Sequence, residues 1–395
     1  MDLFEKCEKF TRVDEIKEKG IYPYFHELRS RPDNVVNMEG KENIIMVGSN
    51  NYLGLTSDEE VIEAGVEAVK NFGSGCSGSR FLNGTITLHT KFEKELAEFL
   101  GKDACMTFGT GFQANLGIIA GITSRHDIIF SDRENHASIY DACKLSYATT
   151  LRYDHNDMKH LEKLLKDAPK DKGKLIVTDG VFSMSGEVCN LPEIVRLAKK
   201  YGARVMVDDA HSFGVLGDHG RGTADHFGLG KDVDIIMGTF SKSLASMGGF
   251  CAASERVINY LRHNSRPYIF CAALGPANIA CANKALDIIK RDDSRQKNLI
   301  KMSKYFRDGI VKRGLKCMSF DITTPIIAIF TYDMVNTFVA CKMLFEAGVY
   351  VNPVIPPAVP EGECLIRASL MATHTTELLD KAMDTIESVL KSMKK

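Results

Sequence analysis

The sequence lacks low-complexity tracts, internal repeats and any excess of charge of one sign. Its 50 basic and 51 acidic side chains leave a net charge of −1, which gives no general electrostatic reason to expect nucleic acid as a partner. No uninterrupted apolar run approaches 18 residues, so no transmembrane span is predicted. The first 20 residues are charged and lack the apolar core of a signal peptide.

The cysteines lack the spacing of a metal or disulfide framework. All 11 stand apart with no C-x-x-C pair, as is typical of reduced cytoplasmic cysteines that fill space as small apolar side chains. The histidines form no H-E-x-x-H motif and no Cys/His cluster, so no metal site is expected. With 44% apolar and 26% charged residues, the composition is that of an ordinary globular protein.

What is present is an alternation of short apolar runs with helical stretches. The runs suit strands that are buried on both faces, and the alternation favours an α/β fold with a mainly parallel sheet between helices. Beyond about residue 290, long amphipathic segments flank short strands, which predicts a smaller α+β C-terminal domain. We therefore expect an N-terminal arm, a large domain and a C-terminal domain, over residues 1–48, 49–290 and 291–395. The predicted strands are residues 104–108, 127–132, 174–180, 203–209, 233–240, 325–330 and 363–370.

Polar residues follow several predicted strands at the edge where ligands collect in parallel sheets. The first run ends in GTGFQA (109–114), which can bind a phosphate through glycine backbone and a helix N-terminus. The same letters match a dinucleotide fingerprint, with Asp132 about twenty residues further on. A tight turn without a ligand explains them equally well.

Two later strands end in an acid and an amine. Asp208 closes the run ARVMVDD, and Lys242 follows VDIIMGTF. Taken singly, each is more often a capping carboxylate or a surface lysine. Together with a phosphate site they match the needs of pyridoxal 5′-phosphate (PLP), because a lysine forms the Schiff base and an aspartate keeps the pyridine nitrogen protonated. A dinucleotide-dependent oxidoreductase would leave this pair unexplained.

The motifs, in order, resemble those of the α-oxoamine synthases, PLP enzymes of fold type I. This family condenses an amino acid with an acyl thioester and releases CO2. Within it, the likeness is strongest to the bacterial branch that joins L-serine to palmitoyl-CoA and begins sphingolipid synthesis by forming 3-ketosphinganine. The motifs are SNNYLGL (49–55), GSGCSGSRFLNGT (73–85), DRENHASIYD (132–141), TDGVFSMSG (178–186), VDDAHSFGVLGDHGRG (207–222), GTFSKSLASMGGF (238–250) and LIRASLMATHT (365–375).

The resemblance implies a role for each matching residue. Lys242 would bind PLP and move the substrate's Cα proton, and Asp208 would pair with the ring nitrogen. His211 would contact the phenolic oxygen, and His136 would stack on the ring and touch the substrate carboxylate. The remaining cofactor contacts would come from Gly111, Phe112, Ser183, Thr239 and Ser241, and the other substrate contacts from Asn51 and Arg367.

The family also implies a homodimer with a shared active site, a cytoplasmic enzyme that can associate peripherally with the inner membrane, and either CoA or acyl carrier protein as donor. Some positions depart from the serine-using pattern: Ser185, Cys271, Ala273 and Val359. Val359 is closer to the glycine-using 2-amino-3-ketobutyrate CoA ligase, so this ligase, or a synthase using glycine, alanine or cysteate, stays an alternative. A catalytically inactive subunit is disfavoured because Lys242, Asp208 and His211 are all present.

Overall fold

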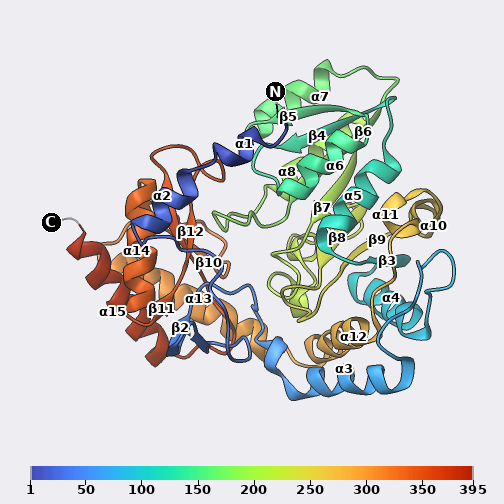
Figure 1. Ribbon diagram of the computed structural model, residues 1–395. Helices are drawn as coiled ribbons and strands as arrows, with labels where there is room; N and C mark the ends of the chain where they lie inside the picture. The colour runs from blue at the N-terminus through green and yellow to red at the C-terminus, as the bar shows by residue number, and fades with distance from the viewer. Residues whose placement is uncertain (1, 394–395) are drawn as a thin grey trace. The chain divides into compact units, whose positions relative to one another are not determined.

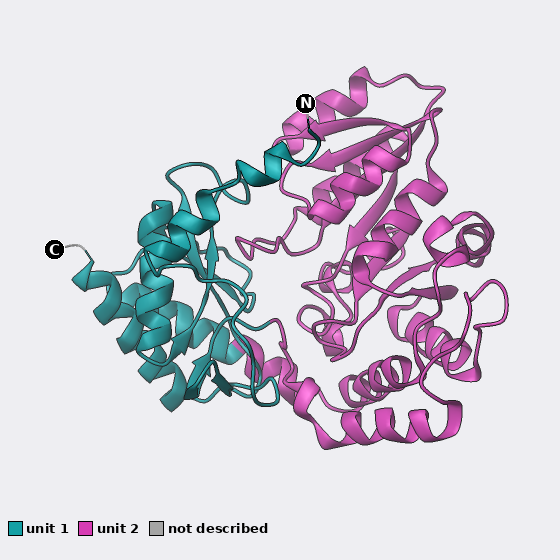
Figure 2. Cartoon of the chain, viewed as in Figure 1, with its two compact units in different colours: residues 1–49, 301–395 teal, residues 50–300 magenta. Residues whose placement is uncertain are grey.

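The computed structural model describes residues 2–393, which divide into two compact units (Figure 2). Unit 1 combines residues 1–49 with residues 301–395, and unit 2 comprises residues 50–300. The N-terminal segment, which we expected to form a separate arm over residues 1–48, belongs to unit 1. The physical reason is strand pairing, because β2 (Lys41–Met46) of this segment pairs in parallel with β11 (Val349–Tyr350).

Unit 2 is built on a seven-stranded sheet in the order β3-β9-β8-β7-β6-β4-β5 (Figure 1). β9 is antiparallel to both of its neighbours, and the remaining pairs are parallel. The mainly parallel sheet expected from the sequence is therefore confirmed. Its strands are β3 (Ala104–Phe108), β4 (Asp127–Asp132), β5 (Thr149–Tyr153), β6 (Gly173–Asp179), β7 (Arg204–Asp208), β8 (Ile235–Thr239) and β9 (Gly249–Ala253).

Helices cover both faces of this sheet (Figure 1). On one face, apolar side chains of α5, α6 and α10 share a core with strand residues such as Met106, Ile129 and Met206, all of them fully buried. The helices of unit 2 are η1 (Leu55–Ser57), α3 (Glu59–Phe72), α4 (Thr87–Leu100), α5 (Gly111–Ile122), α6 (Ala137–Leu145), α7 (Met158–Asp167), α8 (Leu191–Tyr201), η2 (Asp218–Gly220), α9 (Thr223–His226), α10 (Glu255–Asn264), α11 (Arg266–Ile269) and α12 (Pro276–Arg291).

Local sequence explains where the helices near the sheet's carboxyl edge begin. Thr110 caps α5, its hydroxyl accepting a hydrogen bond from the Gln113 N–H at 3.1 Å. His136 caps α6 in the same way, with its ring accepting from the Ser138 N–H at 3.2 Å. Capped starts of this kind hold a helix N-terminus, with its free N–H groups, at a fixed position beside the strand ends.

Unit 1 contains two three-stranded sheets, in the orders β1-β2-β11 and β10-β13-β12. The central β13 is buried at all six positions, as its apolar run predicts. The elements are α1 (Glu5–Glu8), α2 (Arg12–Glu18), β1 (Val35–Met38), β2 (Lys41–Met46), β10 (Ile326–Tyr332), α14 (Met334–Glu346), β11 (Val349–Tyr350), β12 (Asn352–Val354), β13 (Cys364–Ser369) and α15 (Thr376–Ser392), while α13 (Ser294–Lys312) crosses the boundary between the units.

The described part of the chain has neither a membrane-spanning helix nor a metal-binding cluster. No helix within residues 2–393 has the length and apolar character needed to cross a bilayer. Within the same residues, no group of three or more histidine, cysteine or acidic side chains is arranged to hold a metal ion.

Candidate active site

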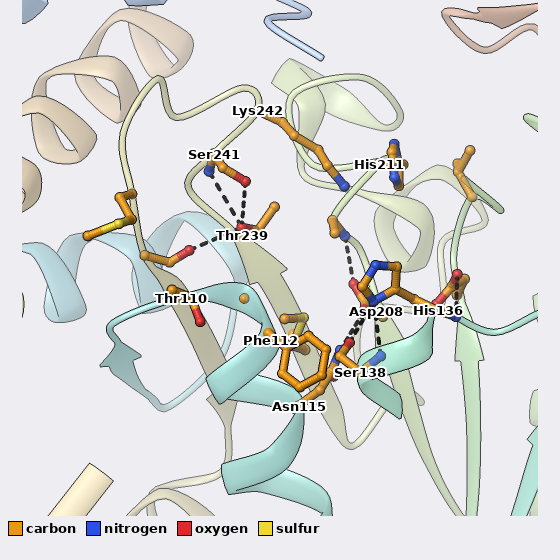
Figure 3. A pocket seen from close by; sticks show the side chains of 17 residues that line it. Thr110, Phe112, Asn115, His136, Ser138, Asp208, His211, Thr239, Ser241 and Lys242 are labelled. Carbon is orange, nitrogen blue, oxygen red and sulfur yellow. Dashed lines mark hydrogen bonds between the residues drawn. The ribbon is translucent and has the colours of Figure 1, made fainter. Parts of the chain in front are cut away.

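A cavity of about 280 Å³ lies at the carboxyl ends of the strands of unit 2 (Figure 3). It collects the polar residues that the sequence places after β3, β6, β7 and β8. Figure 3 shows Lys242 extending toward the region of Asp208 and His136. The lining residues are Thr110, Gly111, Phe112, Asn115, His136, Ser138, Asp179, Val181, Asp208, Ala210, His211, Met237, Thr239, Ser241, Lys242, Met247 and Gly248.

Asp208 is the buried carboxylate of this cavity. It ends β7 and is only 4% exposed. Its Oδ1 accepts from the Ala210 N–H at 2.9 Å, and its Oδ2 accepts from Asn115 Nδ2 at 2.8 Å. Hydrogen bonds compensate for the burial of a carboxylate, so these two donors hold the Asp208 side chain in a fixed orientation at the cavity wall.

A second carboxyl group, Asp179, ends the neighbouring strand β6 and pairs in register with Asp208. Burial is the main cause that raises the pKa of Asp179 well above its usual range. The charge of Asp208 adds to this effect, and Lys242 opposes it. The neutral form is therefore favoured at Asp179.

The segment between β8 and β9 carries the lysine and two hydroxyl groups. Thr239 ends β8, and its Oγ1 donates to the Gly248 carbonyl at 3.1 Å. Thr239 Oγ1 and Ser241 Oγ lie 3.0 Å apart. Lys242 follows in the turn, partly exposed, with its side chain among the cavity residues. These contacts fix the backbone that presents the amine.

The turn between β3 and α5 has the form of a phosphate cradle. At the start of α5, the N–H groups of Gly111 and Phe112 have no partner within the helix. A Cβ on Gly111 would lie 2.9 Å from Thr239 Oγ1, and one on Gly249 would lie 2.8 Å from the Gly111 Cα. Glycine is required at both positions, because the backbone approaches so closely there. Backbone donors, adjacent hydroxyls, Asp208 and Lys242 fit PLP.

Two histidines lie on the cavity wall. His136 lines the cavity, and desolvation by the surrounding protein is the largest cause that lowers its pKa, with Asp208 opposing and Lys242 adding. The neutral imidazole is therefore favoured. His211 is buried, and its Nδ1 lies 2.6 Å from the Tyr52 hydroxyl. Tyr52 is fully buried, so it orients the His211 ring rigidly.

Three residues predicted for the site do not line this cavity. Asn51 is a buried residue of unit 2, and its Oδ1 accepts from the Thr56 N–H at 3.4 Å. Ser183 is partly exposed, two residues beyond the lining residue Val181. Arg367 belongs to unit 1, on β13, where it is 5% exposed and donates to Ser369 Oγ at 2.6 Å. Their assigned roles stay predictions.

The positions that depart from the family pattern have ordinary local surroundings. Ser185 is buried and accepts from the Glu187 N–H at 3.1 Å. Cys271 lies beside the first turn of α5, since Gln113 Nε2 donates to its sulfur at 3.5 Å. The Ala273 N–H donates to the Gly78 carbonyl. Val359 packs against a small core that includes Leu365.

Asp132, the carboxylate that a dinucleotide interpretation needs, is engaged elsewhere. It is 2% exposed, lies 2.9 Å from His155 Nδ1 and accepts from the Asn156 N–H at 2.8 Å. The glycine turn and Asp132 therefore do not act together on one nucleotide, and the oxidoreductase interpretation loses its second element.

The sequence reasoning missed Tyr52, Asn115, Ser138 and Asp179. Tyr52, Ser138 and Asp179 stand within the quoted motifs, and Asn115 directly follows GTGFQA (109–114). The one signal in the local sequence is a polar residue inside an apolar stretch, as Asn115 is within α5. Their importance depends on contacts across the sheet, which no local pattern encodes.

The fold and the site together define a PLP-dependent transferase of fold type I. The family model for aminotransferases of class I and II matches residues 42–386, and the chain belongs to this family. Among curated relatives, "Serine palmitoyltransferase" of Bacteroides thetaiotaomicron is 48% identical over 391 residues, covering 99% of this chain and 98% of its own. An 8-amino-7-oxononanoate synthase of Thermosipho melanesiensis is 42% identical over 381 residues, covering 96% and 97%.

Solved structures agree with these relatives. A structure of serine palmitoyltransferase with PLP superposes with a TM-score of 0.96 and 34% identity, covering 100% of both chains. The resemblance to PLP enzymes of fold type I, the expected cofactor and the enzyme class are thereby confirmed. The serine enzyme named above is more similar to this chain than the 8-amino-7-oxononanoate synthase is.

Proposed function

We propose that the chain condenses L-serine with a long-chain acyl thioester such as palmitoyl-CoA, giving 3-ketosphinganine, CoA and CO2. The observation that carries the reaction class is the gathering of Lys242, Asp208 and His211 around one cavity beside a phosphate cradle. The similarity to serine palmitoyltransferases over nearly the whole chain supports serine and the palmitoyl group as substrates.

Each residue has a defined task in this proposal. PLP, when bound, supplies the electron sink that stabilises negative charge at the Cα of the amino acid. Lys242 removes the Cα proton and later returns it. Asp208 would hold the ring nitrogen of this cofactor in its protonated form, and His211, oriented by Tyr52, would donate to the phenolic oxygen. The planar guanidinium of Arg367 binds the substrate carboxylate in two parallel hydrogen bonds.

The acyl chain and the assembly complete the proposal. Each CH2 buried from water contributes about 0.8 kcal/mol, so a deep apolar groove would strongly favour long chains. We also propose a homodimer that shares residues between two sites, with CoA or acyl carrier protein delivering the acyl group. Peripheral contact with the inner membrane stays a prediction that follows from the apolar product.

A product assay tests the substrates. The purified holoenzyme is offered serine, glycine, alanine and cysteate, each with acetyl-CoA and with palmitoyl-CoA, and products are identified by mass spectrometry. We expect turnover of serine with palmitoyl-CoA. Exclusive turnover of glycine with acetyl-CoA would overturn the proposal in favour of the 2-amino-3-ketobutyrate CoA ligase reaction.

Two variants separate chemistry from binding. Lys242→Ala should abolish turnover and the spectral change on adding serine, because the proton-transfer group is lost. Arg367→Ala should mainly raise the KM for serine, whereas Arg367→Lys keeps the charge but loses the planar fork and should be intermediate. Retained turnover in the lysine variant, or an unchanged KM in Arg367→Ala, contradicts the assigned role.

A further inference from the structure

Asn115 connects two parts of the site that the proposed mechanism treats separately. It lies in α5, four residues after Gly111, and is 1% exposed. Its Nδ2 donates to Asp208 Oδ2 at 2.8 Å and to Ser138 Oγ, also at 2.8 Å (Figure 3). An amide nitrogen has two hydrogens, so both are used, one on each partner.

Ser138 continues this connection to His136. Its hydroxyl lies 2.7 Å from His136 Nδ1, and its backbone N–H donates to the same nitrogen at 3.2 Å. Because a backbone N–H can only donate, Nδ1 must be an acceptor. The neutral imidazole therefore carries its proton on Nε2. The Ser138 hydroxyl accepts from Asn115 and is left to donate to Nδ1.

We propose that Asn115 and Ser138 are positioning residues that join Asp208 and His136 into one hydrogen-bonded unit, fixing the orientation of the carboxylate and the Nε2–H tautomer of the imidazole. The inference rests on the proposed placement of PLP against Asp208 and His136. It adds that the orientation of the Asp208 carboxylate and the tautomer of His136 are fixed by the same pair of residues, Asn115 and Ser138, rather than independently.

The choice of residue at position 115 supports this role over a purely structural one. Asn115 Oδ1 is buried and has no hydrogen-bond partner among the described residues, which is unfavourable for folding. Leucine would avoid that cost but remove the donors to Asp208 and Ser138. Aspartate would bring a further carboxyl group beside Asp208. Only an amide supplies two donors without a charge, so its value lies in the N–H groups.

The first experiment measures the Kd for PLP by titrating the apoprotein with PLP and following the absorbance. Asn115→Leu should weaken PLP binding by about tenfold or more, the effect of losing a hydrogen bond to a charged group. Ser146→Ala is the matched control, because Ser146 is also buried, next to the end of α6, but its hydroxyl bonds only local backbone, donating to the Cys143 carbonyl and accepting from the Ala148 N–H. This variant should bind PLP as the unmodified protein does.

The second experiment reads the tautomer and titration of His136 by NMR of 15N-histidine-labelled apoprotein, with His136→Gln identifying the signal. We expect the proton on Nε2. In Ser138→Ala the titration should move to higher pH by about half a unit, since a donor that opposes protonation of Nδ1 is lost. Ser146→Ala should cause no shift.

These measurements use neither serine nor an acyl thioester, so a wrong substrate assignment leaves their outcome intact. Failure of the unmodified protein to bind PLP would refute the proposed function itself. Unchanged PLP affinity in a folded Asn115→Leu variant, a proton on Nδ1, or an unshifted titration in Ser138→Ala would each overturn the positioning role. If Asn115→Leu does not fold, the titration of Ser138→Ala decides alone.

Discussion

Replacing Gly249 with alanine should displace the backbone of the phosphate cradle, because the added Cβ would press against it. Gly249 begins β9, where it pairs with Phe108 on one side and Thr239 on the other. A Cβ there would lie 2.8 Å from the Gly111 Cα and the Thr110 carbonyl oxygen, and 2.9 Å from the Gly111 nitrogen. All three are backbone atoms, so no side chain can turn aside to relieve the contact.

The magnitude follows from this geometry. To reach ordinary contact distances, the cradle and β9 must separate by about half an ångström, and overpacking of this kind costs about 1–3 kcal/mol of unfolding free energy. For a unit of this size, each kcal/mol lowers Tm by about 2–4 °C. The displaced N–H groups of Gly111 and Phe112 should lose about one charge-assisted hydrogen bond to the phosphate, which corresponds to at least about tenfold weaker PLP binding.

The assay combines thermal unfolding of the apoprotein with a PLP titration. Gly230→Ala is the control, because a Cβ at that position meets no heavy atom within 4 Å and should change stability by less than about 0.5 kcal/mol. The reasoning is refuted if Gly249→Ala binds PLP as tightly as the control does. A loss of stability without loss of affinity would show that the strand moves and the cradle does not.

Two further predictions concern buried charge. Desolvation lowers the pKa of His155, but the hydrogen bond to Asp132 and the ion pairs with Glu187 and Glu134 outweigh it and raise this pKa to about 10. Because this lies above the unfolded value near 6.5, its stabilisation is complete below pH 6.5 and is lost toward pH 10. Denaturant unfolding should therefore show His155→Gln less stable than the unmodified protein at pH 6, with the gap closing by pH 10, and an equal gap at both values would contradict this. The buried Arg80 lies 2.6 Å from the Glu93 carboxylate. Glu93→Gln should lower the free energy of unfolding by about 3–5 kcal/mol, because it leaves Arg80 as an uncompensated buried charge. A loss of less than about 1 kcal/mol would show that the ion pair is dispensable.

In the seven-stranded sheet of unit 2, five strands and the polar residues at their ends were predictable, because burial on both faces produces continuous apolar runs. The carboxyl ends of parallel strands share one edge, so Asp208, Thr239 and Gly111 could be placed near one another before any contact was known. β5 was not predicted, because its exposed edge sequence TTLRY has no such run. β9 was not predicted either, because its sequence GFCAA consists mainly of glycine and small side chains.

The reversal at β9 is what brings the lysine to the phosphate cradle, and this step lies beyond local sequence. In an entirely parallel sheet, the chain leaving β8 would cross over through a helix before returning. Here the segment 240–248 turns back at once, so Gly249 pairs with Thr239 of β8 and with Phe108 of β3. Because Gly111 follows Phe108 by three residues, the turn that carries Lys242 starts and ends beside the cradle. The antiparallel strand therefore keeps the amine and the phosphate donors on one rigid framework, and the glycine at its first position is the condition for that closeness.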